Sequence, residues 1–124
     1  MELTGGRGVD IVYDPVNGPT FEESLRCLAW GGRILILGFL GGAPASARSN
    51  YLLIKGIEAI GVRIGGLMEA YPDIAADNVK KLVDLAAQGK LKPRIWRRFP
   101  LEAAADAVQA LIDRKVIGKA VLVG

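Results

Sequence analysis

Asp10-Ile11-Val12-Tyr13-Asp14 and Ile34-Leu35-Ile36-Leu37 are the stretches of sequence that decide the fold. Both are short and rich in apolar or β-branched residues, which is typical of strands. The second is apolar without interruption, a pattern that favours a strand covered on both faces of a parallel sheet. A third apolar stretch, residues 57–64, is interrupted by Gly61 and predicts another strand, with Gly65-Gly66 marking a boundary after it.

The segments between these strands indicate loops and helices. Residues 15–19 are rich in turn residues, and Thr20-Phe21-Glu22-Glu23 matches a capping box that predicts the start of a helix. Gly31-Gly32 predicts the end of this helix. Its expected apolar face, at helical spacing, comprises Phe21, Leu25, Leu28 and Ala29. Residues 38–49 form a loop rich in Gly, Ala and Ser, and residues 50–54 are expected to form a short helix.

After Pro72 the pattern predicts a helix, a strand, a helix and a strand in turn. One helix presents Val79, Leu82, Val83 and Ala86 and stops near Gly89, and residues 94–99 form a short strand. The second helix spans residues 104–112, and residues 120–123 form the last strand. The fold class is therefore α/β, with a parallel sheet of three strands followed by a helix-strand-helix-strand tail.

The composition indicates a globular domain: of 124 residues, 51% are hydrophobic and 23% are charged. The net charge of +3 is small and spread along the chain, so we expect no nucleic-acid partner. Three arginines at positions 94, 97 and 98 are interpreted as a solvated strand edge. No run of 18 apolar residues occurs, so no membrane partner is expected, and the start of the chain lacks the pattern of a signal peptide.

The residues that commonly bind metals are scarce. The chain has one cysteine, Cys27, and no histidine, so the usual kind of zinc site cannot be built from it alone. Cys27 lies near the predicted apolar helix face and is expected to be an inert core thiol, and Trp30 and Trp96 are expected to be at least partly buried. A single cysteine fits a reducing compartment, and we expect a cytoplasmic protein. The first strand comes only a few residues after Met1, which indicates part of a longer protein.

Several segments, taken together in this order, resemble the medium-chain dehydrogenase/reductase family, on its zinc-independent NADPH:quinone oxidoreductase branch, which includes proteins like zeta-crystallin. They are residues 8–18, 28–39, 50–56 and 99–104, with residues 118–122 closing the chain. The resemblance implies that residues 1–66 are the C-terminal half of a Rossmann-type nucleotide-binding domain. It implies that residues 67–124 are a tail packing on a catalytic domain that this chain lacks.

The resemblance also implies residues that would contact NADPH. Val16, Asn17 and Gly18 would touch the adenosine ribose. An ordinary tight turn, in which an Asn-Gly pair is common, is an equally favoured interpretation and is compatible with the first. The backbone of Leu37, Gly38 and Phe39 would face the nicotinamide ribose, with the alternative that Gly38 only ends a strand. Backbone groups of Val62, Arg63 and Ile64 would hold the carboxamide, with the Arg63 side chain solvated. Lys119 would contact the diphosphate, or is simply a solvated lysine.

The dinucleotide-binding fingerprint is missing from the sequence. Gly5-Gly6-Arg7-Gly8 is not a G-x-G-x-x-G motif and precedes a strand instead of following one. No residue in the chain is assigned a catalytic role, and Asp14 and Glu58 have no sequence partner that would make either a general base. The family's reaction would be hydride transfer from NADPH to a quinone or an activated alkene, and we expect the chain to be inactive alone.

Three alternatives stay open at this point. The parent could be an enoyl reductase or a zinc-free alcohol dehydrogenase, because the pocket and not the fold selects the substrate. The chain could also be a non-catalytic module that dimerises. For each of these alternatives the open edges of the sheet predict a homodimer. The edge at residues 57–64 is favoured, because dimers of the resembled family use it, and the edge at residues 10–14 is the alternative.

Overall fold

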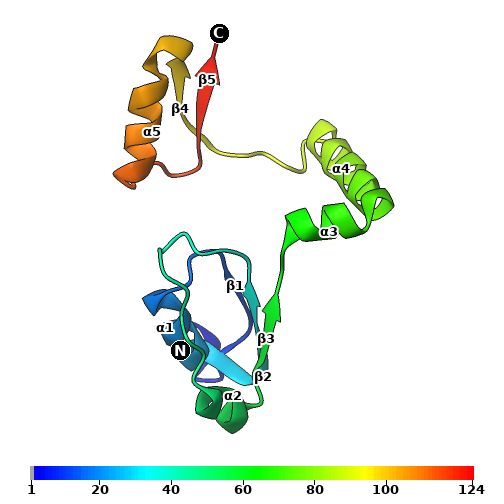
Figure 1. Cartoon of the computed structure of the whole chain (residues 1–124), viewed down its shortest axis with the longest axis vertical. Coiled ribbons are helices and arrows are strands. Elements are labelled where there is room, and N and C mark those ends of the chain that lie inside the picture. Colours follow the sequence, from blue (N-terminus) through cyan, green and yellow to red (C-terminus); the bar gives the residue numbers. More distant parts are fainter. Residues whose placement is uncertain (1) are drawn as a thin grey trace. The chain divides into compact units, whose positions relative to one another are not determined.

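The computed structural model describes residues 2–124, which divide into two compact units, one ending at Ala70 and the other running from Tyr71 to Gly124. The first unit is a three-stranded parallel sheet in the order β1-β2-β3, with helices between the strands (Figure 1). Its elements are η1 (Glu2–Thr4), β1 (Val9–Asp14), α1 (Pro19–Cys27), β2 (Leu28–Ile36), α2 (Ser49–Lys55), β3 (Glu58–Gly61) and α3 (Ile64–Ala70). The predicted α/β class and its three parallel strands are confirmed.

The second unit is the predicted helix-strand-helix-strand tail. Its elements are α4 (Pro72–Ala87), β4 (Ile95–Pro100), η2 (Leu101–Ala103), α5 (Ala104–Ile112) and β5 (Lys119–Val123). β4 and β5 pair in parallel, with Phe99 opposite Leu122, and α5 packs against both strands. The sequence-based division at residues 66 and 67 falls inside α3, whereas the two units divide after Ala70.

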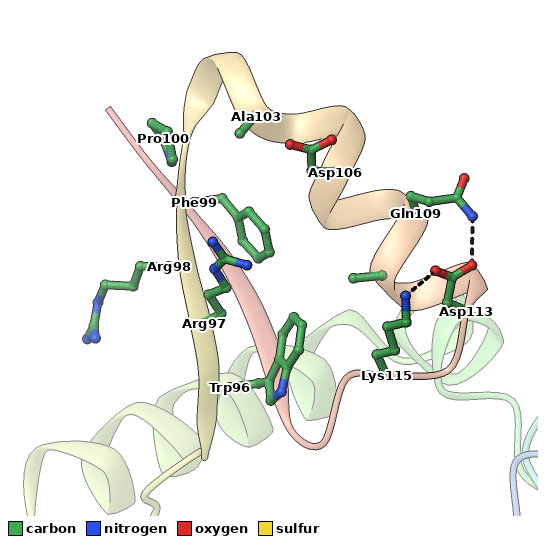
Figure 2. Close-up of a pocket in the computed structure, with 11 residues that line it drawn as sticks. Trp96, Arg97, Arg98, Phe99, Pro100, Ala103, Asp106, Gln109, Asp113 and Lys115 are labelled. Carbon is green, nitrogen blue, oxygen red and sulfur yellow. Dashed lines mark hydrogen bonds and ion pairs between the residues drawn. The ribbon is translucent and has the colours of Figure 1, made fainter.

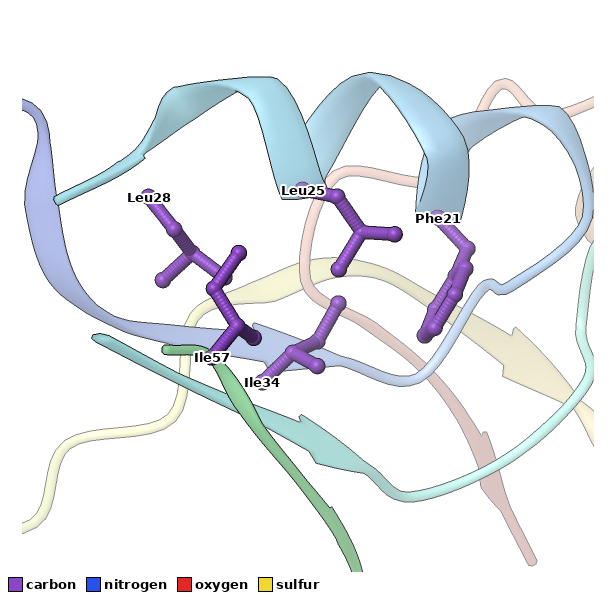
Figure 3. Packing of buried hydrophobic residues seen from close by; sticks show 5 residues of the cluster. All are labelled: Phe21, Leu25, Leu28, Ile34 and Ile57. Carbon is purple, nitrogen blue, oxygen red and sulfur yellow. The ribbon is translucent and has the colours of Figure 1, made fainter. Parts of the chain in front are cut away.

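The core of the first unit lies between α1 and one face of the sheet (Figure 3). Ile34, at the centre of β2, has no exposed surface, and Phe21 and Leu25 from α1 cover it. Leu28 and Ile57 complete this cluster of buried side chains. Each buried apolar side chain of this size stabilises the fold by about 1.5–3 kcal/mol. β2 contains residues 34–36 of the strand predicted at residues 34–37, but it begins earlier, at Leu28, and Leu37 lies beyond its end.

The other face of the same sheet is open within the described part of the chain. Tyr13 on β1 pairs with Leu35 on β2, which pairs with Ile60 on β3, so the three side chains lie in one row across the sheet. Tyr13 is 67% exposed, and Ile11 in the next row is 57% exposed. The expectation that β2 is covered on both faces is thus not met by residues 2–124.

The predicted limits of the first helix are wrong at both ends. The helix begins at Pro19, whose fixed φ suits the first helical position, so Thr20 lies inside the helix and makes no side-chain cap bond. It ends at Cys27, and Leu28 is already extended. Gly31-Gly32 lies within β2, in the part where the pairing with β1 shifts register. Glycine is common at such irregularities of a strand as well as at helix ends, and the sequence alone did not separate the two. Leu28 and Ala29 are buried as expected, but from the strand.

Two expected burials near this strand start are also wrong. Cys27 is exposed at the end of α1, and Trp30 is 82% exposed. Both expectations assumed that the helix continues to Gly31, which would rotate these residues toward the core. Because β2 starts at Leu28, the side-chain period changes from that of a helix to that of a strand. Trp96 on β4 is half-buried, as expected.

The third strand is shorter than predicted. Residues 57–64 were expected to be one strand, but β3 ends at Gly61 and Ile64 is the first residue of α3. Gly65-Gly66 therefore lies in a helix and is not a boundary. The reason is the partner strand: β2 pairs with β3 only from Arg33 to Ile36. Beyond Ile36 one further bond, from the Val62 N–H to the Ile36 carbonyl at 2.8 Å, closes the ladder.

Candidate functional site at the carboxyl ends of the strands

A shallow depression lies where β2 and β3 end. Its volume is about 350 Å³, and its lining combines two of the segments identified from sequence. The lining residues are Ile36, Leu37, Gly38, Phe39, Gly61, Val62 and Arg63. Parallel strands bring their carboxyl ends to one edge of the sheet, which is where open α/β sheets bind ligands. Ile64, as the first residue of α3, is outside this lining.

The depression is largely apolar, with one exposed cation. Phe39 is 52% exposed, Leu37 and Val62 are half-buried, and the Arg63 guanidinium lies 3.7 Å from the Glu69 carboxylate at the surface. The Arg63 side chain is solvated, as the sequence indicated. An apolar lining with exposed backbone suits a flat aromatic ring that is held by main-chain groups. A Cβ added at Gly38 would lie 3.3 Å from the carbonyl oxygen of Pro15, so the backbone of Gly38 runs close to the β1–α1 turn.

The turn between β1 and α1 is organised by a buried carboxylate. Asp14 is 3% exposed, and its Oδ1 accepts hydrogen bonds from the N–H groups of Val16 at 3.0 Å and Asn17 at 2.7 Å. Its Oδ2 is also buried and has no hydrogen-bond partner among residues 2–124. Asp14 was considered as an acid from sequence, and the geometry gives it a structural use inside the turn.

Gly18, one of the three turn residues identified from sequence, lines a hollow. That hollow, of about 570 Å³, is formed by Gly18, Pro19, Glu22, Glu23, Gly41, Ala43, Pro44, Ala45 and Ser46. Val16 is half-buried, and Asn17 is 3% exposed with its side-chain Oδ1 accepting the Ala45 N–H at 2.6 Å. Sequence reasoning missed Gly41 and Ala45, which lie in the glycine- and alanine-rich loop. The only available signal was that composition.

Lys119 belongs to the second unit. It is the first residue of β5, it is exposed, and its N–H donates to the Arg94 carbonyl at 2.8 Å. The structure therefore groups residues 37–39 with residues 62 and 63, places the 16–18 turn beside the same loop, and leaves Lys119 in a separate unit.

The second unit has a hollow of its own between β4 and α5, with a volume of about 530 Å³. Figure 2 shows Trp96 and Phe99 on the α5 side of β4, and Arg98 pointing the opposite way. The Arg97 guanidinium lies 4.8 Å from the centre of the Phe99 ring. At the rim, Asp113 accepts hydrogen bonds at 2.8 Å from Lys115 and from Gln109, and these bonds, that of Lys115 first, hold the pKa of Asp113 below its usual value. Sequence reasoning did not identify this hollow.

Two classes of site find no support in the described residues. Within residues 2–124 no three His, Cys, Asp or Glu side chains lie close enough to hold a metal ion. Among the helices of the same residues, none combines the length and the apolar character that crossing a bilayer requires.

Comparison with known proteins gives a consistent result. Residues 1–122 match the sequence profile of a family described as zinc-binding dehydrogenase. The chain is 39% identical over 121 residues to quinone oxidoreductase-like protein 2 of Mus musculus, an alignment that covers 98% of this chain and 35% of that protein. It is 32% identical over 130 residues to a 2-haloacrylate reductase of a Burkholderia species, covering 98% of this chain and 37% of that protein.

Among solved structures, a mycobacterial protein complexed with NADPH superposes on the chain with a TM-score of 0.84. The two sequences are 28% identical, and the match covers 99% of this chain and 38% of the mycobacterial one. The chain thus spans about a third of the length of the curated relatives, 35% and 37% for the two above.

Proposed function

Because the chain belongs to the zinc-binding dehydrogenase family, as a C-terminal part of its quinone oxidoreductase type, we propose that it forms the nicotinamide end of the cofactor site in an NADPH-dependent quinone oxidoreductase. The observation that carries the proposal is the depression at the ends of β2 and β3, which joins in one lining two separate segments predicted to face the cofactor. The similarity to an NADPH-complexed structure supports the choice of dinucleotide.

The residues present fit such a ligand. Leu37, Phe39 and Val62 offer apolar surface for the nicotinamide ring, and Gly61 has no heavy atom within 4 Å of the place its Cβ would take, so the backbone is open to close approach. Arg63 is an exposed cation at the rim. When bound, NADPH supplies the hydride, and the chain's own residues bind and orient it. We assign no catalytic side chain to residues 2–124.

We assign no zinc to this chain, although the family's description names that metal. The sequence has no histidine and one cysteine, and Cys27 is exposed at the end of α1. A tetrahedral site of Cys and His ligands would have to come almost wholly from other protein. We also expect the parent enzyme to work in the cytoplasm, where a free exposed thiol stays reduced.

The direct test is a chimera. The mycobacterial NADPH-binding protein is made with its matching C-terminal region replaced by this chain, and the unaltered protein serves as the positive control. We expect the chimera to bind NADPH and to oxidise it with a simple quinone. A chimera that folds but fails to bind NADPH would refute the proposal.

A second candidate substrate is an activated alkene, which the 32% identity to a 2-haloacrylate reductase favours. The same chimera can be assayed with a quinone and with a 2-haloacrylate at equal concentration. The substrate with the higher kcat/KM identifies the substrate class.

The isolated chain provides a third test. We expect no quinone reductase activity and weak or no NADPH binding, because most of the stabilisation of the dinucleotide's phosphates comes from a helix N-terminus next to a glycine-rich fingerprint. The sequence has no such fingerprint. NADPH oxidation above the buffer rate, or a micromolar dissociation constant by calorimetry, would contradict this expectation. It would then favour a self-sufficient module over a part of a larger enzyme.

A further inference from the structure

The side chain of Asn17 connects two segments that are far apart in sequence. Its Oδ1 accepts the N–H of Ala45 at 2.6 Å, across 28 positions of the chain. Asn17 is 3% exposed, and its backbone has a positive φ of 60°. Asparagine tolerates this left-handed conformation better than most residues and also carries a side-chain acceptor. The carboxamide is therefore used inside the protein and offers little surface to a ligand.

Further bonds run between the same two segments. The N–H of Leu37 donates to the Asp14 carbonyl at 2.9 Å, that of Leu40 to the Pro15 carbonyl at 3.2 Å, and that of Gly41 to the Val16 carbonyl at 2.7 Å. Together with the bond from Ala45 to Asn17, these contacts join the turn of residues 14–17 to the loop of residues 37–45 along its length.

Two features make this contact specific. Asp14 stabilises the turn, since its Oδ1 accepts hydrogen bonds from the N–H groups of both Val16 and Asn17. Gly41 allows the loop to approach, since a Cβ at that position would lie 2.9 Å from the Val16 carbonyl. The first residues of the loop, 37–39, line the depression at the ends of β2 and β3. The position of the loop therefore sets the shape of that depression.

We propose that Asn17 is a positioning residue: its carboxamide holds the loop of residues 37–45 against the β1–α1 turn, and this contact keeps residues 37–39 in place for the ligand of the depression. The identity of that ligand rests on the proposed function. The contact itself does not, because the Ala45 bond is made between two segments of this chain.

The test of the contact is amide hydrogen exchange, measured residue by residue by NMR on the whole chain without dinucleotide. Asn17→Gly keeps the left-handed backbone and removes the acceptor. The Ala45 amide should then exchange about fivefold faster, the change expected for loss of one net hydrogen bond. Asn17→Asp restores an acceptor at the same position and should restore most of the protection. Rescue by this variant separates the carboxamide's role from that of the backbone conformation.

Arg114→Gly is the matched control. Arg114 is the other described non-glycine residue with a positive φ, 56°, and it is exposed in the second unit. This control should leave the Ala45 amide unchanged. Wild-type exchange at Ala45 in Asn17→Gly would overturn the proposal.

A second arm measures the consequence for the ligand in the chimera. If residues 37–39 are held less often in the binding geometry, the apparent affinity falls in proportion. Asn17→Gly should therefore raise the KM for NADPH severalfold, with kcat within about twofold of the parent. A fall in kcat at unchanged KM would overturn the positioning role. A chimera that never binds NADPH, together with the expected change at Ala45, would refute the proposed function and leave the contact supported.

Discussion

Lys55, at the end of α2, hydrogen-bonds to neighbouring elements of the first unit, and removal of its ammonium group should destabilise that unit. Its Nζ donates to the carbonyl oxygens of Arg26 and Leu28, each at 2.8 Å, and lies 3.5 Å from that of Leu25. The carbonyls of Leu25 and Arg26 belong to the last turn of α1 and have no partner within the helix, whereas Leu28 is the first residue of β2. A positive charge at this end also interacts favourably with the helix dipole. Lys55 thus joins α2 to the end of α1.

The size of the effect follows from these contacts. Lys55→Met keeps the aliphatic stem of this half-buried side chain and removes the ammonium group. Hydrogen bonds to charged groups contribute about 1.5–3 kcal/mol each when buried, and Lys55 is partly solvated, so we expect a total loss of about 2 kcal/mol. With an m-value of about 1–2 kcal/mol/M in urea, the unfolding midpoint should fall by about 1–2 M.

The assay is urea unfolding followed by circular dichroism. Lys80→Met is the control, because Lys80 is an exposed lysine on α4, in the other unit, and its removal should shift the midpoint little. Equal midpoints for Lys55→Met and wild type would refute the reasoning, since the three carbonyls would then be satisfied equally well by water.

Three further predictions concern the second unit, the rim of its hollow and the sheet edge. Gly118→Ala should destabilise the protein by about 2–4 kcal/mol in urea unfolding, because φ is 110° and a Cβ would clash with the Arg94 carbonyl. Gly65→Ala, at a helical position with no atom near the added Cβ, should be neutral or stabilising. Lys115 lowers the pKa of Asp113, so Asp113→Asn should slightly reduce the free energy of unfolding above about pH 4. The difference in stability between variant and wild type should vanish as the pH falls through the lowered pKa of Asp113, and a constant difference down to about pH 2 would contradict this prediction. Light scattering should show a dimer of the chain and not a monomer near 13.2 kDa. If the edge strand β3 forms the dimer interface, Ile60→Pro should weaken the dimer, because proline removes one backbone donor from that edge.

Sequence reasoning succeeded where local pattern and tertiary packing agree. The strand at residues 10–14 and the helix at residues 104–112 appear within one residue of their predicted limits as β1 and α5. The helix was predicted from apolar residues at helical spacing, and the strand from its β-rich composition. The strand was also expected to be buried, which is wrong for Ile11 and Tyr13, both largely exposed. The same reasoning failed at Gly31-Gly32, where glycine has two structural uses and only the pairing of β2 with β1 selects between them.

The geometry of the candidate site could not be predicted from sequence for a different reason, because it depends on contacts between distant residues. Nothing near Asn17 in sequence indicates that its side chain is taken by Ala45, and Ile64 leaves the strand because β2 supplies no further partner. The turn and ligand interpretations of residues 16–18 were equally supported by sequence. In the structure the side chain of Asn17 is buried and bonded to Ala45, and Gly18 lines a hollow, so the ligand interpretation stays a prediction beside the turn.

The open face of the sheet connects these observations to the dimer prediction. The uninterrupted apolar run in β2 favours cover on both sides, yet Tyr13 and Ile11 are largely exposed opposite the α1 face. A dimer formed by pairing β3 edges would extend the sheet and leave that face open, because edge pairing adds strands within the plane. Edge pairing would therefore provide hydrogen-bond partners for the backbone of β3 but would leave the apolar row of Tyr13, Leu35 and Ile60 uncovered. We expect other protein to cover the row, and proteins of the relatives' length have about two-thirds of their chain available for it. Replacing Tyr13 with a lysine should then leave the dimer intact and lower the yield of folded chimera; loss of the dimer instead would place the interface on the face and not on the edge.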